Sequence, residues 1–333
     1  MQVVEKYQPI SPKYLIEAIK KNFSSLMGAF YEMQSSFLNS IYKKHDGIEN
    51  ASIILFFTRS NHLEIIRQRE KNLNFNISLE MFWENLNQIT KPAEKITSIV
   101  QKTGIPKETV RRKVKKLLNT GILLNNNKDN KYTLVINKKD KLEYFDFVNK
   151  EIKNISSFIY KLNNHLGLNF NSKAVEAEVK SQFSFYWYHL LSCQLEWLKM
   201  WQTKLQDNDL ILIMLQTIIP TLSHVDKNIK NLNNIFINIG KMQSKFDTAK
   251  SSINATSVSQ VTGIPRATCA RKLDKLVTLG FLVHQANSKR YFVNQNFEKR
   301  TTGLLSKENV NFTIELFSEY FSIILNSLVQ NKK

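Results

Sequence analysis

One stretch of 41 residues occurs twice in this chain of 333 residues, and the repeat constrains the fold more than any other sequence feature. The first copy, called motif one, spans residues 95–135, and motif two spans residues 254–294. The two copies align without gaps at an offset of 159 residues and share 15 identical residues. We infer an ancient duplication and fusion, which gives two units at residues 1–166 and 167–333.

The rest of each unit has the pattern of a helical protein. Apolar residues recur at helical spacing, and Gly and Pro are rare within these stretches. The expected fold class is therefore mainly α, with the two units joined by a central layer of long helices. The long helices are expected near 12–42, 140–165, 173–206 and 306–329, and shorter ones near 50–69, 78–90, 209–222 and 225–246.

Motif one has the order helix, turn, helix and two short strands. Gly104 suits a left-handed C-cap after the first helix, and Pro106 fits the first turn of the next one. The second helix is expected at 107–119 and ends at Gly121. Two strand-like runs follow, at 122–125 and 131–136.

Motif two repeats this plan. Its second helix is expected at 266–279, Gly280 ends it, and strands are expected at 281–284 and 291–294. Cys269 falls on the apolar face of that helix and is interpreted as a small core residue.

The shared pattern TGIP-x-x-T-x-x-R-K-x-x-x-L-x-x-x-G resembles the winged helix-turn-helix of bacterial transcription regulators, in particular the MarR, IclR and CRP-type groups. The resemblance implies winged helices at 95–136 and 254–294, whose recognition helices enter successive major grooves of double-stranded DNA. The order of elements resembles a fused, MarR-like pseudo-dimer, acting as one chain or as a homodimer of it. The wing departs from the MarR pattern, because Asp129-Asn130-Lys131 only approximates its Asp-x-Arg.

The positive charge of the chain is concentrated in the two motifs. The formal net charge is +19, of which motif one carries +8 and motif two +5. A general excess of lysine would spread the charge evenly along the chain. The concentration favours contact with a polyanion, and nucleic acid fits best.

The charge and the resemblance together predict which residues contact DNA. Arg112 and Arg271 could each bind a guanine, and Glu108 could accept from cytosine where Ala267 cannot, so the two half-sites could differ. The alternative is that these cations are ordinary solvated side chains on exposed helix faces. The predicted set is Lys107, Glu108, Thr109, Arg111, Arg112, Lys113, Lys116, Lys128, Lys131, Arg266, Thr268, Arg271, Lys272, Lys275, Lys289 and Arg290.

An aromatic run in the second unit is a candidate effector pocket. Phe185, Trp187, Tyr188, Trp197 and Trp201 could line a site for a small apolar or aromatic molecule, and ordinary helix packing is the favoured alternative. Tyr132 and Tyr291 match between the motifs and are interpreted as packing residues of the wings.

Other chemistry finds little support in the sequence. The histidines show no metal-ligand spacing, the two cysteines are far apart, and no phosphate-binding glycine loop or hydrolase motif occurs. We therefore expect no metal, no cofactor and no enzyme activity. No stretch resembles a signal peptide or a spanning helix, so a cytoplasmic, nucleoid-associated protein without membrane contact is expected.

The leading functional hypothesis is a sequence-specific transcriptional regulator. A replication initiator of the plasmid type is the first alternative, because such initiators also carry two winged helices in one chain. The second alternative is a winged-helix module for protein–protein contact or chromosome organisation.

Overall fold

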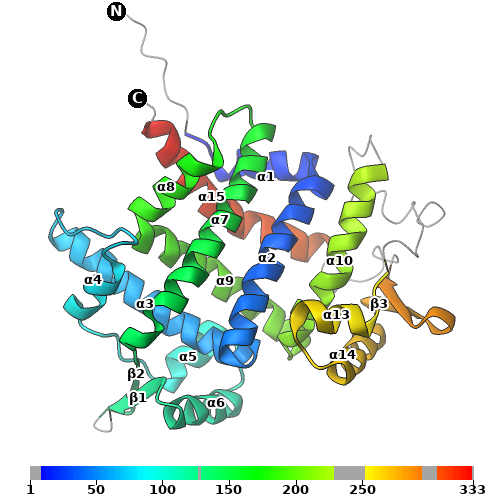
Figure 1. Cartoon of the computed structure of the whole chain (residues 1–333), viewed down its shortest axis with the longest axis horizontal. Helices are drawn as coiled ribbons and strands as arrows, with labels where there is room; N and C mark the ends of the chain where they lie inside the picture. Colours follow the sequence, from blue (N-terminus) through cyan, green and yellow to red (C-terminus); the bar gives the residue numbers. More distant parts are fainter. Residues whose placement is uncertain (1–8, 127–128, 229–251, 295–305, 332–333) are drawn as a thin grey trace, which may run out of the picture.

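Helices make up most of the described chain, which confirms the expected mainly α class (Figure 1). The computed structural model describes residues 9–126, 129–228, 252–294 and 306–331. Most of the expected helix near 225–246 lies outside these residues.

The first half of the chain contains seven α-helices and one hairpin among its described residues. Motif one supplies α5, α6 and the hairpin. The elements are α1 (Pro12–Lys21), α2 (Phe23–His45), α3 (Ile48–Lys71), α4 (Phe82–Gln88), α5 (Ile96–Thr103), α6 (Lys107–Asn119), β1 (Leu123–Asn126), β2 (Lys131–Leu134) and α7 (Lys141–His165).

The described part of the second half repeats this order, apart from a counterpart of α4. Motif two supplies α13, α14 and the second hairpin. The elements are α8 (Ser172–Ser181), α9 (Phe183–Leu205), α10 (Asp209–Asn228), α13 (Ala255–Thr262), α14 (Arg266–Thr278), β3 (Leu282–Gln285), β4 (Arg290–Val293) and α15 (Lys307–Gln330).

The helices are interrupted at matching places in the two halves. Asn22 separates α1 from α2 and Gln182 separates α8 from α9, with nearly equal φ and ψ values (−114°, 39° and −115°, 40°). The expected single helices at 12–42 and 173–206 are therefore each two helices. Asp46 and Gln206 end α2 and α9 in the same left-handed conformation.

Helices of one half pack mainly against helices of the other. The α2 helix packs on α10, and the matching pair is α9 on α3. Likewise α1 packs on α15, and α8 packs on α7. Each contact therefore has a counterpart with the halves exchanged, and the central helical layer in Figure 1 is built jointly by both halves.

Aromatic side chains from both halves meet in the core of this layer. Phe30 of α2 lies against Phe158 of α7 and Phe317 of α15 in edge-to-face contacts, with ring centroids 5.9 Å and 4.8 Å apart. By length and hydropathy α15 could cross a membrane, but it packs against α1, α8 and α9.

Candidate nucleic-acid interface

Motif one folds as two helices at a sharp corner, followed by a hairpin. Gly104 ends α5 at φ 69°, and buried Ile105 fills the corner before Pro106 starts α6. The inner face of α6 buries Val110, Val114 and Leu117, and polar residues take the outer faces. This alternation arises because apolar side chains three and four residues apart fall on one side of a helix.

The hairpin of motif one is anchored to the start of α5. Strands β1 and β2 pair antiparallel, and Tyr132 of β2 also forms a two-way backbone bridge with Glu94. The bridge fixes the hairpin beside the helix pair rather than leaving it as a free arm.

Motif two has the same geometry. Gly263 ends α13 at φ 75°, and Cys269 is buried on the inner face of α14 as expected. Tyr291 bridges to Ile253 as Tyr132 does to Glu94. The hairpin turns match too, because Asn130 and Lys289 adopt left-handed φ values of 48° and 50°.

The N-terminal halves of α6 and α14 present most of their polar side chains to solvent. Lys107 and Arg112 on α6, and Arg266 and Arg271 on α14, are exposed. No ion pair or side-chain hydrogen bond joins Arg112 or Arg271 to another described residue. These two arginines are therefore available to a ligand outside the chain.

Neighbouring predicted residues are partly engaged within the chain. Arg111 forms an ion pair with Glu108 one helical turn earlier, and the Arg266 Nε donates to Thr256 Oγ1 at 3.1 Å. Thr109 and Thr268 are half-buried. Such exposed pairs are weak and exchange readily for other partners.

The prediction that Lys272 faces outward to contact DNA is corrected by the structure. Its side chain is 11% exposed, and its Nζ lies 2.8 Å from Asp207 Oδ1 and 3.3 Å from Asp209 Oδ2. Lys275, the next cation along α14, lies 3.8 Å from Asp207 Oδ2. The C-terminal half of α14 is thus attached to the segment between α9 and α10.

The matching lysines of α6 make the equivalent contacts. Lys113 Nζ lies 3.4 Å from Glu49 Oε2, and Lys116 Nζ lies 2.6 Å from Asp46 Oδ2. The hydrogen bond and the charge of Lys116 lower the pKa of Asp46. We call Asp46, Glu49, Asp207 and Asp209 the acidic junction.

The two sides of the acidic junction also touch each other. The backbone N–H of Ile48 donates to Asp209 Oδ1 at 3.4 Å, which joins the start of α3 to the start of α10. Both α6 and α14 are therefore anchored at one place. Figure 1 shows both helices at the lower edge of the molecule, with α14 to the right of α6.

The predicted hairpin cations differ in their availability. Lys289 is exposed at its turn and Lys131 is half-buried, while the Arg290 guanidinium binds the hydroxyl and carbonyl of Ser252. Lys128 lies outside the described residues. Tyr291 is buried against His284 and donates to Asp274 at 2.8 Å; burial and this bond raise its pKa to about 12.

The aromatic run of the second unit packs against neighbouring helices. Trp187, Trp197 and Trp201 are fully buried, and the Trp197 indole donates to Thr313 Oγ1 at 3.0 Å. Tyr188 accepts from Arg59 at 2.8 Å, and Phe185 packs beside His189. These side chains fill the interface between α9 and its neighbours, which agrees with the favoured interpretation as helix packing.

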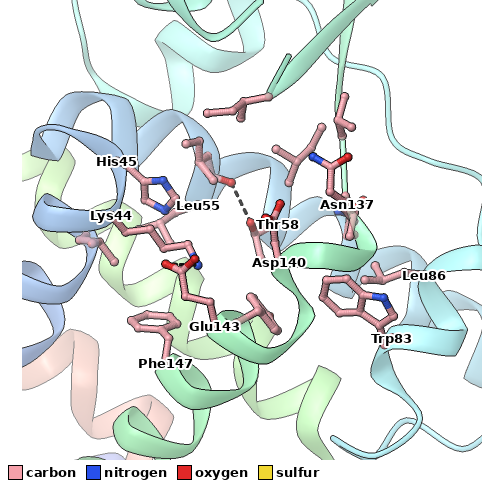
Figure 2. Close-up of a pocket in the computed structure, with 18 of the residues that line it drawn as sticks. Lys44, His45, Leu55, Thr58, Trp83, Leu86, Asn137, Asp140, Glu143 and Phe147 are labelled. Atoms are coloured by element: carbon pink, nitrogen blue, oxygen red, sulfur yellow. Dashed lines mark hydrogen bonds and ion pairs between the residues drawn. The ribbon is translucent and has the colours of Figure 1, made fainter. Parts of the chain in front are cut away.

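A different cavity, of about 370 Å³, lies beside motif one, and Trp187 is the one predicted pocket residue that lines it. Its other walls come from α2, α3, α4, α7 and the end of the hairpin. The cavity could not be predicted from the sequence, because its lining residues come from six separate segments of the chain (Figure 2). Among the described residues, no group of three or more His, Cys, Asp or Glu could hold a metal ion.

Comparisons of this chain with protein-family models, with curated proteins and with solved structures gave no match.

Proposed function

We propose that the chain is a sequence-specific DNA-binding regulator that uses α6 and α14 as a pair of recognition helices. Each motif then acts as a winged helix-turn-helix, with its hairpin as the wing. The observation that carries the proposal is the matched pair of exposed, unpaired arginines, Arg112 and Arg271, on two duplicated helices at one edge of the molecule. Arginine at such a position can bind the O6 and N7 atoms of guanine.

The acidic junction supports the two-site form of this proposal. It holds α6 and α14 through ion pairs from Lys113 and Lys272 onward and leaves their N-terminal residues, up to Arg112 and Arg271, exposed. In helix-turn-helix proteins the N-terminal residues of the recognition helix reach the base edges. A shared anchor also fixes the relative orientation of the two helices, as a dimer interface does in two-subunit regulators.

The exchange of contacts between the halves supports a pseudo-dimer. In a twofold dimer, a contact between two elements recurs with the subunits exchanged. The pairs α2–α10 and α9–α3 follow this rule within one chain. We infer an approximate twofold axis that passes near the acidic junction.

The test is DNA binding by a double variant, Arg112→Ala with Arg271→Ala. Each lost guanine contact would cost about 1–3 kcal/mol of discrimination, so specific affinity should fall by about a hundredfold or more at fixed salt. Sites selected by the chain from random duplexes supply the specific DNA, and circular dichroism checks that the fold is kept.

The matched control is Arg67→Ala with Lys173→Ala, which removes two exposed cations from α3 and α8. It changes the net charge equally but leaves both motifs intact, so specific affinity should fall only slightly. Equal losses in the two double variants would contradict the assignment of Arg112 and Arg271 to base contacts.

One observation favours a second candidate, a protein-contact module. Leu124 and Val283 occupy matching places on the hairpins and are 62% and 37% exposed. Such apolar positions would suit a protein partner. Measuring DNA binding at several salt concentrations distinguishes the two candidates. DNA binding through phosphates weakens steeply with salt, whereas a protein-contact module would show no salt-dependent DNA binding.

A further inference from the structure

Two lysines of the proposed recognition helices are exposed and yet bound to carboxylates of the chain. Lys116 on α6 and Lys275 on α14 are related by the 159-residue offset of the repeat, and their side chains are 52% and 47% exposed. Lys116 Nζ lies 2.6 Å from Asp46 Oδ2, and Lys275 Nζ lies 3.8 Å from Asp207 Oδ2. The charge of each lysine is therefore balanced within the chain.

The two carboxylates differ in what else they do. Asp207 is 26% exposed and also holds Lys272, so it contributes to the packing of α14. Asp46 is 83% exposed, and among the described residues its carboxylate forms one ion pair, with Lys116. Exposed ion pairs contribute little to stability. The structural role of Asp46 is therefore small, and its negative charge lies in solvent beside α6.

Asp46 keeps its charge at neutral pH and lies near both recognition helices. The hydrogen bond and the charge of Lys116 lower the pKa of the Asp46 carboxyl, so it stays ionised. Burial, and then the charges of Asp209, Asp46 and Asp207, raise the pKa of Tyr42 in the last turn of α2. These carboxylates therefore surround the end of α2, where α6 and α14 are both anchored.

A carboxylate in this position competes with the phosphates of DNA. Both groups are anionic oxygen acceptors for the same ammonium, and Asp46 holds Lys116 before any duplex approaches. A lysine that stays on Asp46 neutralises no phosphate and releases no counterion from the duplex. The base-reading candidate on the same helix, Arg112, has no such competitor among the described residues. The ion pair thus weakens phosphate contact and leaves base contact unaffected.

We propose that Asp46 is a specificity-determining residue, which binds Lys116 in place of a DNA phosphate and so limits binding to duplexes of any sequence. The inference rests on the proposed function, because it concerns the same recognition helix. Phosphate contacts carry no sequence information of their own. Motif one carries a net charge of +8, and a genome offers a vast excess of competing nonspecific sites, so restraint of phosphate contact favours the correct site.

The test is DNA binding by the full chain with Asp46→Asn, titrated against random-sequence duplexes and against a duplex that the chain has selected. Asp46 has φ 55°, a left-handed conformation that Asn tolerates, so the fold should be kept. The freed Lys116 gains about one phosphate contact on random duplexes. The slope of log affinity against log salt should steepen by about 0.9, and affinity at 0.1 M salt should rise about fivefold to tenfold.

The selected duplex should gain less, about twofold at most. Its base contacts hold α6 in one register, which restricts the phosphates that Lys116 reaches. The ratio of specific to nonspecific affinity should therefore fall in Asp46→Asn.

Two further variants separate the local effect from net charge. Glu70→Gln removes one exposed carboxylate near the other end of α3. Glu70 lies 22 residues after Ile48, or about 33 Å along the helix, which is well beyond the screening length of about 10 Å at 0.1 M salt. Its affinity for random duplexes should stay within about twofold of wild type. Asp46→Asn with Lys116→Ala removes the freed cation as well, and should restore the wild-type salt slope.

Three results would overturn the role of Asp46. They are an unchanged salt slope in Asp46→Asn, an equal gain in Glu70→Gln, and equal gains on random and selected duplexes. Circular dichroism of each variant checks that the fold is kept. A wild-type chain that binds no duplex refutes the proposed function itself, whereas a wild-type chain that binds DNA as well as Asp46→Asn does refutes the specificity role alone.

Discussion

At the residue scale, the matched lysines of α6 and α14 have a role that their charge alone did not predict. Lys113 and Lys272 were expected to face DNA, yet they bind carboxylates of the acidic junction. The sequence could not reveal this, because Asp207 is 65 residues away from Lys272 along the chain. Spacing within a helix says which residues share a face, but not what that face meets.

Lys272 should therefore matter for stability. Lys272→Met removes the cation that contacts both Asp207 and Asp209 and leaves only Lys275, at 3.8 Å from Asp207. This should lower the free energy of unfolding by about 1–3 kcal/mol, less than for a fully buried pair. Urea unfolding measures the loss. Lys113→Met, at a more exposed and longer ion pair, should cost less than about 1 kcal/mol. A larger loss for Lys113→Met than for Lys272→Met would contradict the greater contribution of the Lys272 ion pairs to stability.

His62 should make stability depend on pH. It is fully buried between Phe82 and Phe183, and desolvation lowers its pKa from 6.5 to about 3. Below pH 6.5 the unfolded chain takes up a proton that the folded chain refuses, so stability falls as the pH drops toward 3. Between pH 7 and pH 5 this amounts to about 2 kcal/mol.

The measurement compares urea unfolding of wild type and His62→Leu at pH 7 and pH 5. The variant is expected to start from a lower stability, because it loses the stacking with Phe82, but to lose less on acidification. Equal losses in both proteins would show that His62 does not carry the effect.

At the element scale, local signals predicted the helices near 50–69, 140–165 and 306–329 to within about two residues. By contrast, α4 (Phe82–Gln88) is shorter than the expected 78–90, and α10 runs to Asn228 instead of ending near 222. The expected recognition helices at 107–119 and 266–279 are found at Lys107–Asn119 and Arg266–Thr278, because Pro and Gly mark their ends. The breaks at Asn22 and Gln182 carry no such residue, and so the long helices there were expected to be continuous. The candidate DNA-facing arginines could be named from the motif, whereas the cavity depends on contacts between distant segments.

The corner between α5 and α6 should be sensitive to a single methyl group. Gly104 has φ 69°, and a Cβ there would lie 2.9 Å from Lys199 Cγ. Gly121, after α6, has φ 70° but nothing within 4 Å of the same atom. Gly121→Ala should cost only the left-handed backbone strain of about 1–2 kcal/mol. Gly104→Ala should cost about 1 kcal/mol more, because the stem of Lys199 must move.

Thermal unfolding of the two alanine variants checks this contrast. The reason for the clash is a contact between halves, since Lys199 belongs to α9. If the two variants melted at the same temperature, the close packing of motif one on α9 would be wrong.

At the scale of the whole molecule, the duplication gives one chain the paired elements that two identical subunits would otherwise supply. The halves exchange helices in the central layer, and the ion pairs at the acidic junction tie α6 and α14 to this layer. Folding of the chain then sets the spacing of the two proposed recognition helices without a dimerisation step.

The most direct test of the two-site proposal is hydroxyl-radical footprinting of the chain on a duplex that it has selected, with the number of chains per duplex counted by sedimentation. One bound chain should protect two patches on the same face of the duplex, with centres about one helical turn, or roughly 34 Å, apart. A single protected patch per chain, or no protection at all, would contradict it.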